Sequence, residues 1–157
     1  MRLEELNDDI VLFDVDGVLG KFDFGELGFK ILEKEKWLRK NMECDVYSYV
    51  QKTNFFDDFI KAHNNLMVLS VAFSSYEQKN KIKFIERNYS NIDKENIIFV
   101  AADDLKVEVL KQLREDFDKK GFGNKRIILI EDTSRIMSSI EKLNNPRIKC
   151  FLLSDFL

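Results

Sequence analysis

The chain has few of the residue types that mark several protein classes. It contains only two cysteines among 157 residues, Cys44 and Cys150, and their separation matches no metal-binding or redox spacing. We therefore expect two free thiols, which are typical of proteins in a reducing cytoplasm. The single histidine, His63, stands among asparagines without a second histidine, so we expect it at the surface and assign it no catalytic role.

Long apolar runs are also missing. No run approaches the length of a membrane span, and the polar segment 1–9 lacks the apolar core of a secretory signal. The net charge of −3 gives no reason to expect nucleic-acid polymers or membrane surfaces as partners. Hydrophobic residues make up 45% and charged residues 34%, which is ordinary for a globular protein. These features predict one soluble cytoplasmic domain over 1–157.

Proline and glycine are scarce, and their positions predict turns. The only proline, Pro146, is expected to end a helix before a final strand over 148–153. Four of the six glycines lie within 17–28, which predicts tight turns or a short hairpin over 17–29. No buried strand is evident over 20–65, so we interpret that segment as a flap with a small helical insert.

Short apolar runs alternate with amphipathic segments along the rest of the chain. This alternation predicts an α/β fold, a three-layer sandwich with helices on both faces of a five-stranded, mainly parallel sheet. The expected strands cover 10–13, 66–73, 96–101, 127–130 and 148–153. The expected helices cover 31–41, 45–51, 55–63, 74–89, a stretch after an N-cap at Asp103, and a stretch around 136–143.

Two carboxylates follow the first expected strand. Asp14 and Asp16 come directly after the run 10–13 and precede Gly17. In an extended chain the side chains at i and i+2 point the same way, so these two anions would repel each other unless a cation lay between them. Hard carboxylate oxygens suit Mg²⁺. The alternative is that the two acids only end the strand and cap the following turn.

Other polar residues stand at the ends of the later strands. Because the carboxyl ends of parallel strands meet at one edge of a sheet, ligands of open α/β sheets bind there. Ser70 lies near the end of the second strand, the region 103–106 follows the third, and Glu131 with Asp132 follows the fourth. We expect all of them to gather beside the carboxylates of the first strand.

In their order along the chain, these features resemble the four motifs of the haloacid dehalogenase (HAD) superfamily of phosphotransferases. The resemblance covers nearly the whole chain, and its most specific part is the first motif, Phe13-Asp14-Val15-Asp16-Gly17-Val18. The other three motifs are represented by Ser70, by Lys106 near a helix start, and by the pair Glu131-Asp132. The resemblance implies the sheet order 3-2-1-4-5 and a small helical cap of the C1 type within 20–65.

The resemblance also implies a phosphomonoester hydrolase that works through an aspartyl phosphate. Asp14 would attack phosphorus, and Asp16 would protonate the leaving oxygen and later take a proton from the attacking water. Ser70 would hydrogen-bond a phosphoryl oxygen, and Lys106 would offset its charge. The small residue Ser70 could instead belong to the core, with Ser74 and Ser75 as other candidates, and Lys106 could be a solvated helix residue, with Lys111 and Lys125 as substitutes.

The metal implied by the resemblance is Mg²⁺. Asp14, the backbone carbonyl of Asp16, and the pair Glu131-Asp132 would hold it, directly or through water. The pair departs from the commoner family form, which has two aspartates, and we favour Asp132 as the direct ligand. Glu131 and Asp132 could instead only cap the following helix.

The substrate indicated by the resemblance is a small phosphorylated metabolite. Chain length, cap position and Leu69-Ser70-Val71 are loosely similar to the small 5′(3′)-deoxyribonucleotidase branch, which makes a nucleoside monophosphate the first candidate and sugar phosphates or small organic phosphates the next. Most aromatics of the insert are expected to form its own core, although one or two could stack on a base. They are Phe22, Phe24, Phe29, Trp37, Tyr47, Tyr49, Phe55, Phe56 and Phe59.

Two other functions compete with this interpretation. A phosphate-accepting receiver domain also gathers acids, but its acceptor aspartate follows the third strand, whereas the DxD motif here follows the first. A degenerate family member that binds a phosphorylated ligand without turnover would keep the same residues. Either way, we expect a monomer or a homodimer.

Overall fold

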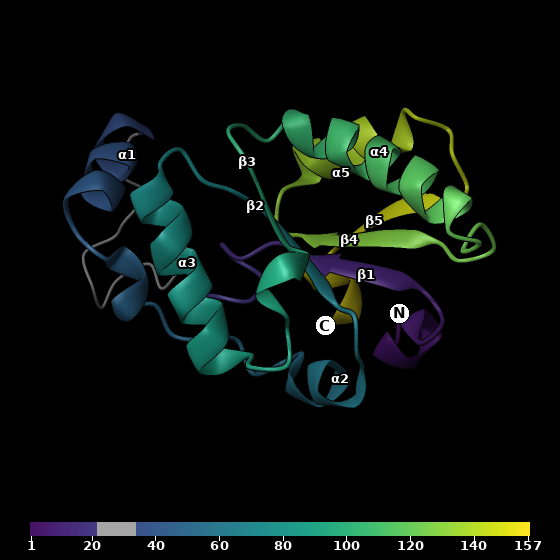
Figure 1. Cartoon of the computed structure of the whole chain (residues 1–157), viewed down its shortest axis with the longest axis horizontal. Coiled ribbons are helices and arrows are strands. Elements are labelled where there is room, and N and C mark those ends of the chain that lie inside the picture. Colours follow the sequence, from purple (N-terminus) through teal and green to yellow (C-terminus); the bar gives the residue numbers. More distant parts are fainter. Residues whose placement is uncertain (22–33) are drawn as a thin grey trace.

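A five-stranded parallel sheet forms the centre of the computed structural model, which describes residues 1–21 and 34–157 (Figure 1). The strands lie in the order β3-β2-β1-β4-β5, and every pair is parallel. The predicted α/β class and the strand order are therefore confirmed. The strands are β1 (Ile10–Phe13), β2 (Met67–Val71), β3 (Ile97–Val100), β4 (Ile127–Glu131) and β5 (Ile148–Leu152).

The first strand is the middle of the sheet and the point where the strand order reverses. Phe13 pairs with Val68 of β2 on one side and with Ile130 of β4 on the other. Successive side chains of β1 enter opposite layers, Val11 and Phe13 on one face and Leu12 on the other. Burial on both faces explains why β1 is a continuous apolar run.

Helices cover both faces of the sheet. On the face of Phe13 lie α2 (Asp57–Ala62) and α3 (Ser75–Asn88), and on the face of Leu12 lie α4 (Leu105–Lys119) and α5 (Ser134–Glu141). Leu110 of α4 and Ile136 and Ile140 of α5 are buried, with Val107, Leu113 and Phe117 packed beside them. These are the positions that the helical periodicity predicts.

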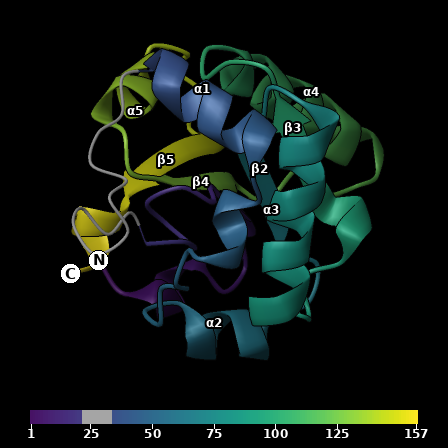
Figure 2. The ribbon, with the colours of Figure 1, turned by 90° about the vertical axis from the view of Figure 1, so that its left-hand side faces the viewer.

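The segment between β1 and β2 contains α1 (Lys34–Glu43), a 3-10 turn (Val46–Ser48) and α2. Helix α1 contacts α3 and lies beyond the carboxyl ends of the strands (Figures 1 and 2). The helix expected over 45–51 is only the 3-10 turn, and α2 is shorter than the expected 55–63. Much of the hairpin expected over 17–29, including Gly25 and Gly28, and the start of the helix expected over 31–41 lie outside the described residues.

The aromatic residues of this segment do not all belong to a separate lid. Phe56 and Phe59 of the α2 region pack edge-on against Phe13, with ring centroids 5.1 and 6.4 Å away. They are therefore part of the main core, which corrects our expectation for these two rings. Tyr49 and Phe55 are exposed. Phe22, Phe24, Phe29 and the side chain of Trp37 lie outside the described part of the chain.

Three helix ends show how local chemistry sets the boundaries. Ser74 caps α3 as expected, because its hydroxyl accepts the backbone N–H of Glu77 at 3.1 Å. The N-cap of α4 is Asp104 and not the predicted Asp103, and the Asp104 side chain makes no capping bond. Helix α5 ends at Glu141, and Asn144 then adopts a left-handed φ of 50°, so this turn ends the helix before Pro146 is reached.

Neither cysteine is in a disulfide. Burial raises the pKa of the Cys150 thiol to about 12, so it stays protonated, and Cys44 is half-buried. His63 is also half-buried and stacks on the ring of Phe59 at 4.1 Å. Among the described residues, no helix combines the length and the apolar character that crossing a bilayer requires.

Candidate active site

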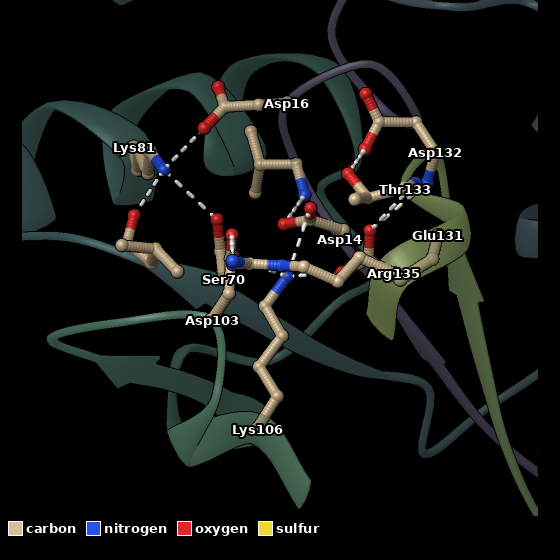
Figure 3. Close-up of polar contacts among 12 residues, drawn as sticks. Asp14, Asp16, Ser70, Lys81, Asp103, Lys106, Glu131, Asp132, Thr133 and Arg135 are labelled. Atoms are coloured by element: carbon tan, nitrogen blue, oxygen red, sulfur yellow. Dashed lines mark hydrogen bonds and ion pairs between the residues drawn. The ribbon is translucent and has the colours of Figure 1, made fainter. Parts of the chain in front are cut away.

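Three carboxylates meet where β1 and β4 end. The N–H of Asp14 donates to the carbonyl of Ile130 at 3.0 Å, so the parallel register places Asp14 directly beside Glu131. One oxygen from each of Asp14, Glu131 and Asp132 lies within 4.8 Å of the others. Figure 3 shows the three side chains converging from the two strand ends. Oxygen atoms of this kind at this spacing can hold a divalent cation.

A buried ammonium group offsets part of this negative charge. Lys106, in the first turn of α4, has no exposed surface, and its Nζ lies 3.0 Å from Oδ2 of Asp14. The same Nζ pairs with Oε1 of Glu131 and lies 3.9 Å from Asp103. Burial alone would lower the pKa of Lys106, but Asp14 and Glu131 more than compensate and raise it, so Lys106 stays charged. It is therefore not a solvated helix residue.

The two acids of the fourth motif have different surroundings. Glu131 is fully buried: Oε1 faces Lys106, and Oε2 accepts the N–H groups of Asp132 (3.1 Å) and Thr133 (3.3 Å). Burial and then the charge of Asp14 raise the pKa of Glu131 to about 8, although Lys106 opposes this. Asp132 is exposed, and its Oδ1 accepts the hydroxyl of Thr133 at 3.0 Å. If a metal binds here, these surroundings favour Asp132 as its direct ligand.

Asp14 is held in one orientation. Its side chain is almost completely buried, Oδ1 accepts the backbone N–H of Val15 at 2.7 Å, and Oδ2 faces Lys106. Burial raises the pKa of Asp14, the charge of Asp16 raises it further, and Lys106 and Lys81 lower it. A divalent cation at the carboxylate cluster would favour the ionised form, which is the form that can attack an electrophile.

The glycine of the first motif allows a close approach to this cluster. Gly17 has a φ of +76°, and a Cβ built on it would lie only 2.2 Å from Oδ2 of Asp132. Its N–H donates to the carbonyl of Gly20 at 2.9 Å, which closes the turn after β1. Both the backbone angle and the contact with Asp132 require glycine here.

The ammonium group that faces Asp16 is not the one that faces Asp14. Its Oδ2 lies 2.8 Å from Nζ of Lys81, and its Oδ1 accepts the hydroxyl of Tyr47 at 2.7 Å. Strand β1 ends at Phe13 and the chain begins to turn at Val15, so the alternation expected of an extended chain does not continue to Asp16. Each carboxylate consequently has its own ammonium group, Lys106 for Asp14 and Lys81 for Asp16.

Sequence reasoning missed Lys81 and the role of Tyr47. Lys81, in α3, has no exposed surface and also donates to Oγ of Ser70 (3.0 Å) and to the carbonyl of Val71. The signal was its position, one turn before the buried Phe84 on the apolar side of the helix. Tyr47 is also buried, and burial together with Asp16 raises its pKa, so its hydroxyl stays a donor.

The structure places Ser70 next to Lys81. Ser70 is fully buried in β2, and its hydroxyl accepts a hydrogen bond from that lysine at 3.0 Å. Ser74, another candidate, is occupied with capping α3. A direct bond from Ser70 to a phosphoryl oxygen remains a prediction.

A cavity of about 480 Å³ opens beside Asp16. It lies between the loop after β2 and the start of α4, and α5 contributes Arg135 to its wall. Arg135 is largely exposed and lies 3.4 Å from Asp103. A small organic group could therefore lie next to Asp16. The residues that line the cavity are Asp16, Val71, Phe73, Glu77, Ala102, Asp103, Asp104 and Arg135.

Comparisons with models of protein families, with curated proteins and with solved structures found no match to this chain.

Proposed function

We propose that this protein is a Mg²⁺-dependent phosphomonoester hydrolase of the HAD type that forms an aspartyl phosphate on Asp14. The observation that carries the proposal is the arrangement around Asp14. Its carboxylate lies within 4.8 Å of the carboxylates of Glu131 and Asp132 and 3.0 Å from the ammonium group of Lys106. A carboxylate flanked by positive charge is suited to attack an anionic phosphate.

The donor set fits the proposed metal. Mg²⁺ prefers hard oxygen ligands and usually keeps several waters beside one or two carboxylates. Asp14 and the exposed Asp132 would bind it directly, and Glu131 would contact it only indirectly. When bound, the ion would supply charge that offsets the phosphate and the developing negative charge on its oxygens.

Two carboxyl groups of the chain, those of Asp14 and Asp16, would then carry out the two steps of the reaction. An oxygen of Asp14 attacks phosphorus, and the bond to the leaving oxygen breaks while Asp16 donates its proton to that oxygen. In the second step Asp16 takes a proton from a water molecule, the water oxygen attacks phosphorus, and the bond to Asp14 breaks. Lys106 stays protonated throughout and faces Asp14.

The substrate would be a small phosphorylated metabolite. Because Asp16 lines the cavity, the leaving group would lie there, next to the half-exposed ring of Phe73. An aromatic face of this kind can stack on a nucleobase, which keeps nucleoside monophosphates among the candidates, together with sugar phosphates and small organic phosphates. A cytoplasmic location and action as a monomer or homodimer belong to the same proposal.

The test is phosphate release from a panel of phosphomonoesters with Mg²⁺ and with EDTA. We expect turnover that needs Mg²⁺ and falls by about 10³-fold or more in Asp14→Asn, which keeps the shape of the side chain but removes the nucleophile. The matched control is Asp58→Asn, because Asp58 is an exposed acid in the first turn of α2. It should leave turnover unchanged.

Two results would contradict the proposal. Full activity in Asp14→Asn would exclude Asp14 as the nucleophile, provided that circular dichroism shows both variants folded. A wild-type protein that releases no phosphate from any compound, yet binds inorganic phosphate in calorimetry, would instead be a module that binds phosphorylated ligands without turnover.

A further inference from the structure

We propose that Lys81, together with Tyr47, positions Asp16 for proton transfer to the leaving group. This inference rests on the proposed phosphatase function and assigns roles to two residues outside its four motifs. Lys81 lies in α3 and Tyr47 in the 3-10 turn after α1, so the carboxylate of Asp16 is held by two segments distant from it in the chain (Figure 3 shows Lys81).

The hydrogen bonds of Lys81 exclude a direct role in binding phosphate. An ammonium group has three protons to donate. Lys81 has three hydrogen-bond acceptors, namely Oδ2 of Asp16 at 2.8 Å, Oγ of Ser70 at 3.0 Å and the carbonyl of Val71, and Oε1 of Glu77 lies 3.8 Å from it. With no exposed surface and every proton engaged, Lys81 has no donor left for a substrate. It acts through Asp16.

Tyr47 holds the other oxygen of the same carboxylate. Its hydroxyl lies 2.7 Å from Oδ1 of Asp16, and its ring packs against Phe84 at 6.2 Å. Nζ of Lys81 lies 5.3 Å from the centre of the Tyr47 ring, so the two residues also contact each other. Tyr47 and Lys81 are both buried, whereas 23% of the Asp16 side chain is exposed to solvent.

This arrangement has a direct consequence for catalysis. Asp16 lies past the end of β1, where its backbone forms only an isolated bridge with Gly20, so no helix or strand fixes its side chain. A general acid must lie within hydrogen-bond reach of the leaving oxygen, and small displacements lower the rate steeply. Lys81 and Tyr47 direct the carboxyl group of Asp16, which lines the cavity, and their donors stabilise the carboxylate that remains after the proton has left.

The experiment compares two leaving groups. p-Nitrophenolate leaves without needing a proton, whereas the alkoxide of glycerol 3-phosphate must be protonated. In Lys81→Met, release of glycerol in the first turnover should slow by about 10²-fold, and release of p-nitrophenol by no more than about threefold. Tyr47→Phe keeps the ring and removes only the hydroxyl, and it should slow glycerol release by about tenfold. Measuring the first turnover separates this step from hydrolysis of the aspartyl phosphate.

The controls separate a positioning role from a structural one. Lys83→Met removes an exposed lysine of the same helix and should change neither rate. Equal slowing of both substrates in folded Lys81→Met and Tyr47→Phe would overturn the inference, because a general loss of structure does not depend on the leaving group. If Lys81→Met does not fold, Tyr47→Phe alone decides by the same criterion. A wild-type protein that hydrolyses no phosphomonoester of the panel would overturn the phosphatase proposal, and this inference with it.

Discussion

Replacing Gly17 with alanine tests whether the turn after β1 shapes the proposed metal site. Two separate costs are expected. The φ of +76° places alanine in the left-handed region, which costs about 1–2 kcal/mol of folding free energy. The new methyl group would also lie 2.2 Å from Oδ2, 2.7 Å from Cγ and 3.0 Å from Cβ of Asp132, so that side chain must move.

The second cost affects function more than stability. Asp132 is exposed, so its carboxylate can swing into solvent without opening the core. Metal sites, however, tolerate ligand displacements of only about 0.2 Å. We therefore expect the Mg²⁺ affinity of Gly17→Ala to fall by about 10- to 100-fold, as it does when residues supporting a ligand are changed.

Gly121 provides a matched control. It has a similar φ of +87°, but a Cβ there would meet nothing within 4 Å. Gly121→Ala should therefore lower the free energy of unfolding by about 1–2 kcal/mol, as Gly17→Ala does, and the two values should agree to within about 1 kcal/mol. It should keep wild-type Mg²⁺ affinity. Urea unfolding measures the first quantity, and the rise in melting temperature during a Mg²⁺ titration measures the second. If Gly17→Ala bound Mg²⁺ as tightly as Gly121→Ala, our account of the contact between Gly17 and Asp132 would be wrong.

Two further predictions concern charge at the site. Burial raises the pKa values of Asp14, Glu131 and Asp132, so in the absence of metal the folded state favours their protonated forms. Their contribution to the free energy of unfolding is therefore complete below the ordinary carboxyl pKa. It is lost as the pH rises through about 8, the pKa of Glu131. If Mg²⁺ binds the deprotonated groups as proposed, its effect on the melting temperature should be larger at pH about 8 than at pH about 6, and an equal or smaller effect would argue against binding at these carboxylates. Among the described residues, the cavity wall carries four acids and one base, so 2-phosphoglycolate should be hydrolysed about fivefold more slowly than 2-hydroxyethyl phosphate, measured as kcat/KM. The opposite order would show that Arg135, the one base, governs recognition of the leaving group.

The site was only partly predictable. Glu131 and Lys106 could be placed beside Asp14 because parallel strands end at a common edge and the helix after β3 starts there. The partners of Asp16 could not, because the aspartate lies past the end of β1, where strand alternation no longer sets the side-chain direction. Nor could the sequence show that the rings of Phe56 and Phe59 pack under the sheet rather than in a lid.

The sequence by itself determined the fold class and the location of the site. Alternating apolar runs and amphipathic segments specify buried strands and covering helices, and the acids stand at the end of β4 and just after β1. Only the tertiary structure decided which groups the carboxylate of Asp16 faces. A lysine on the buried side of α3 gives no sign of its partner until the turn after β1 brings Asp16 to within 2.8 Å of it. Ion pairs such as Lys81–Asp16 join residues far apart in the chain, and packing alone brings them together.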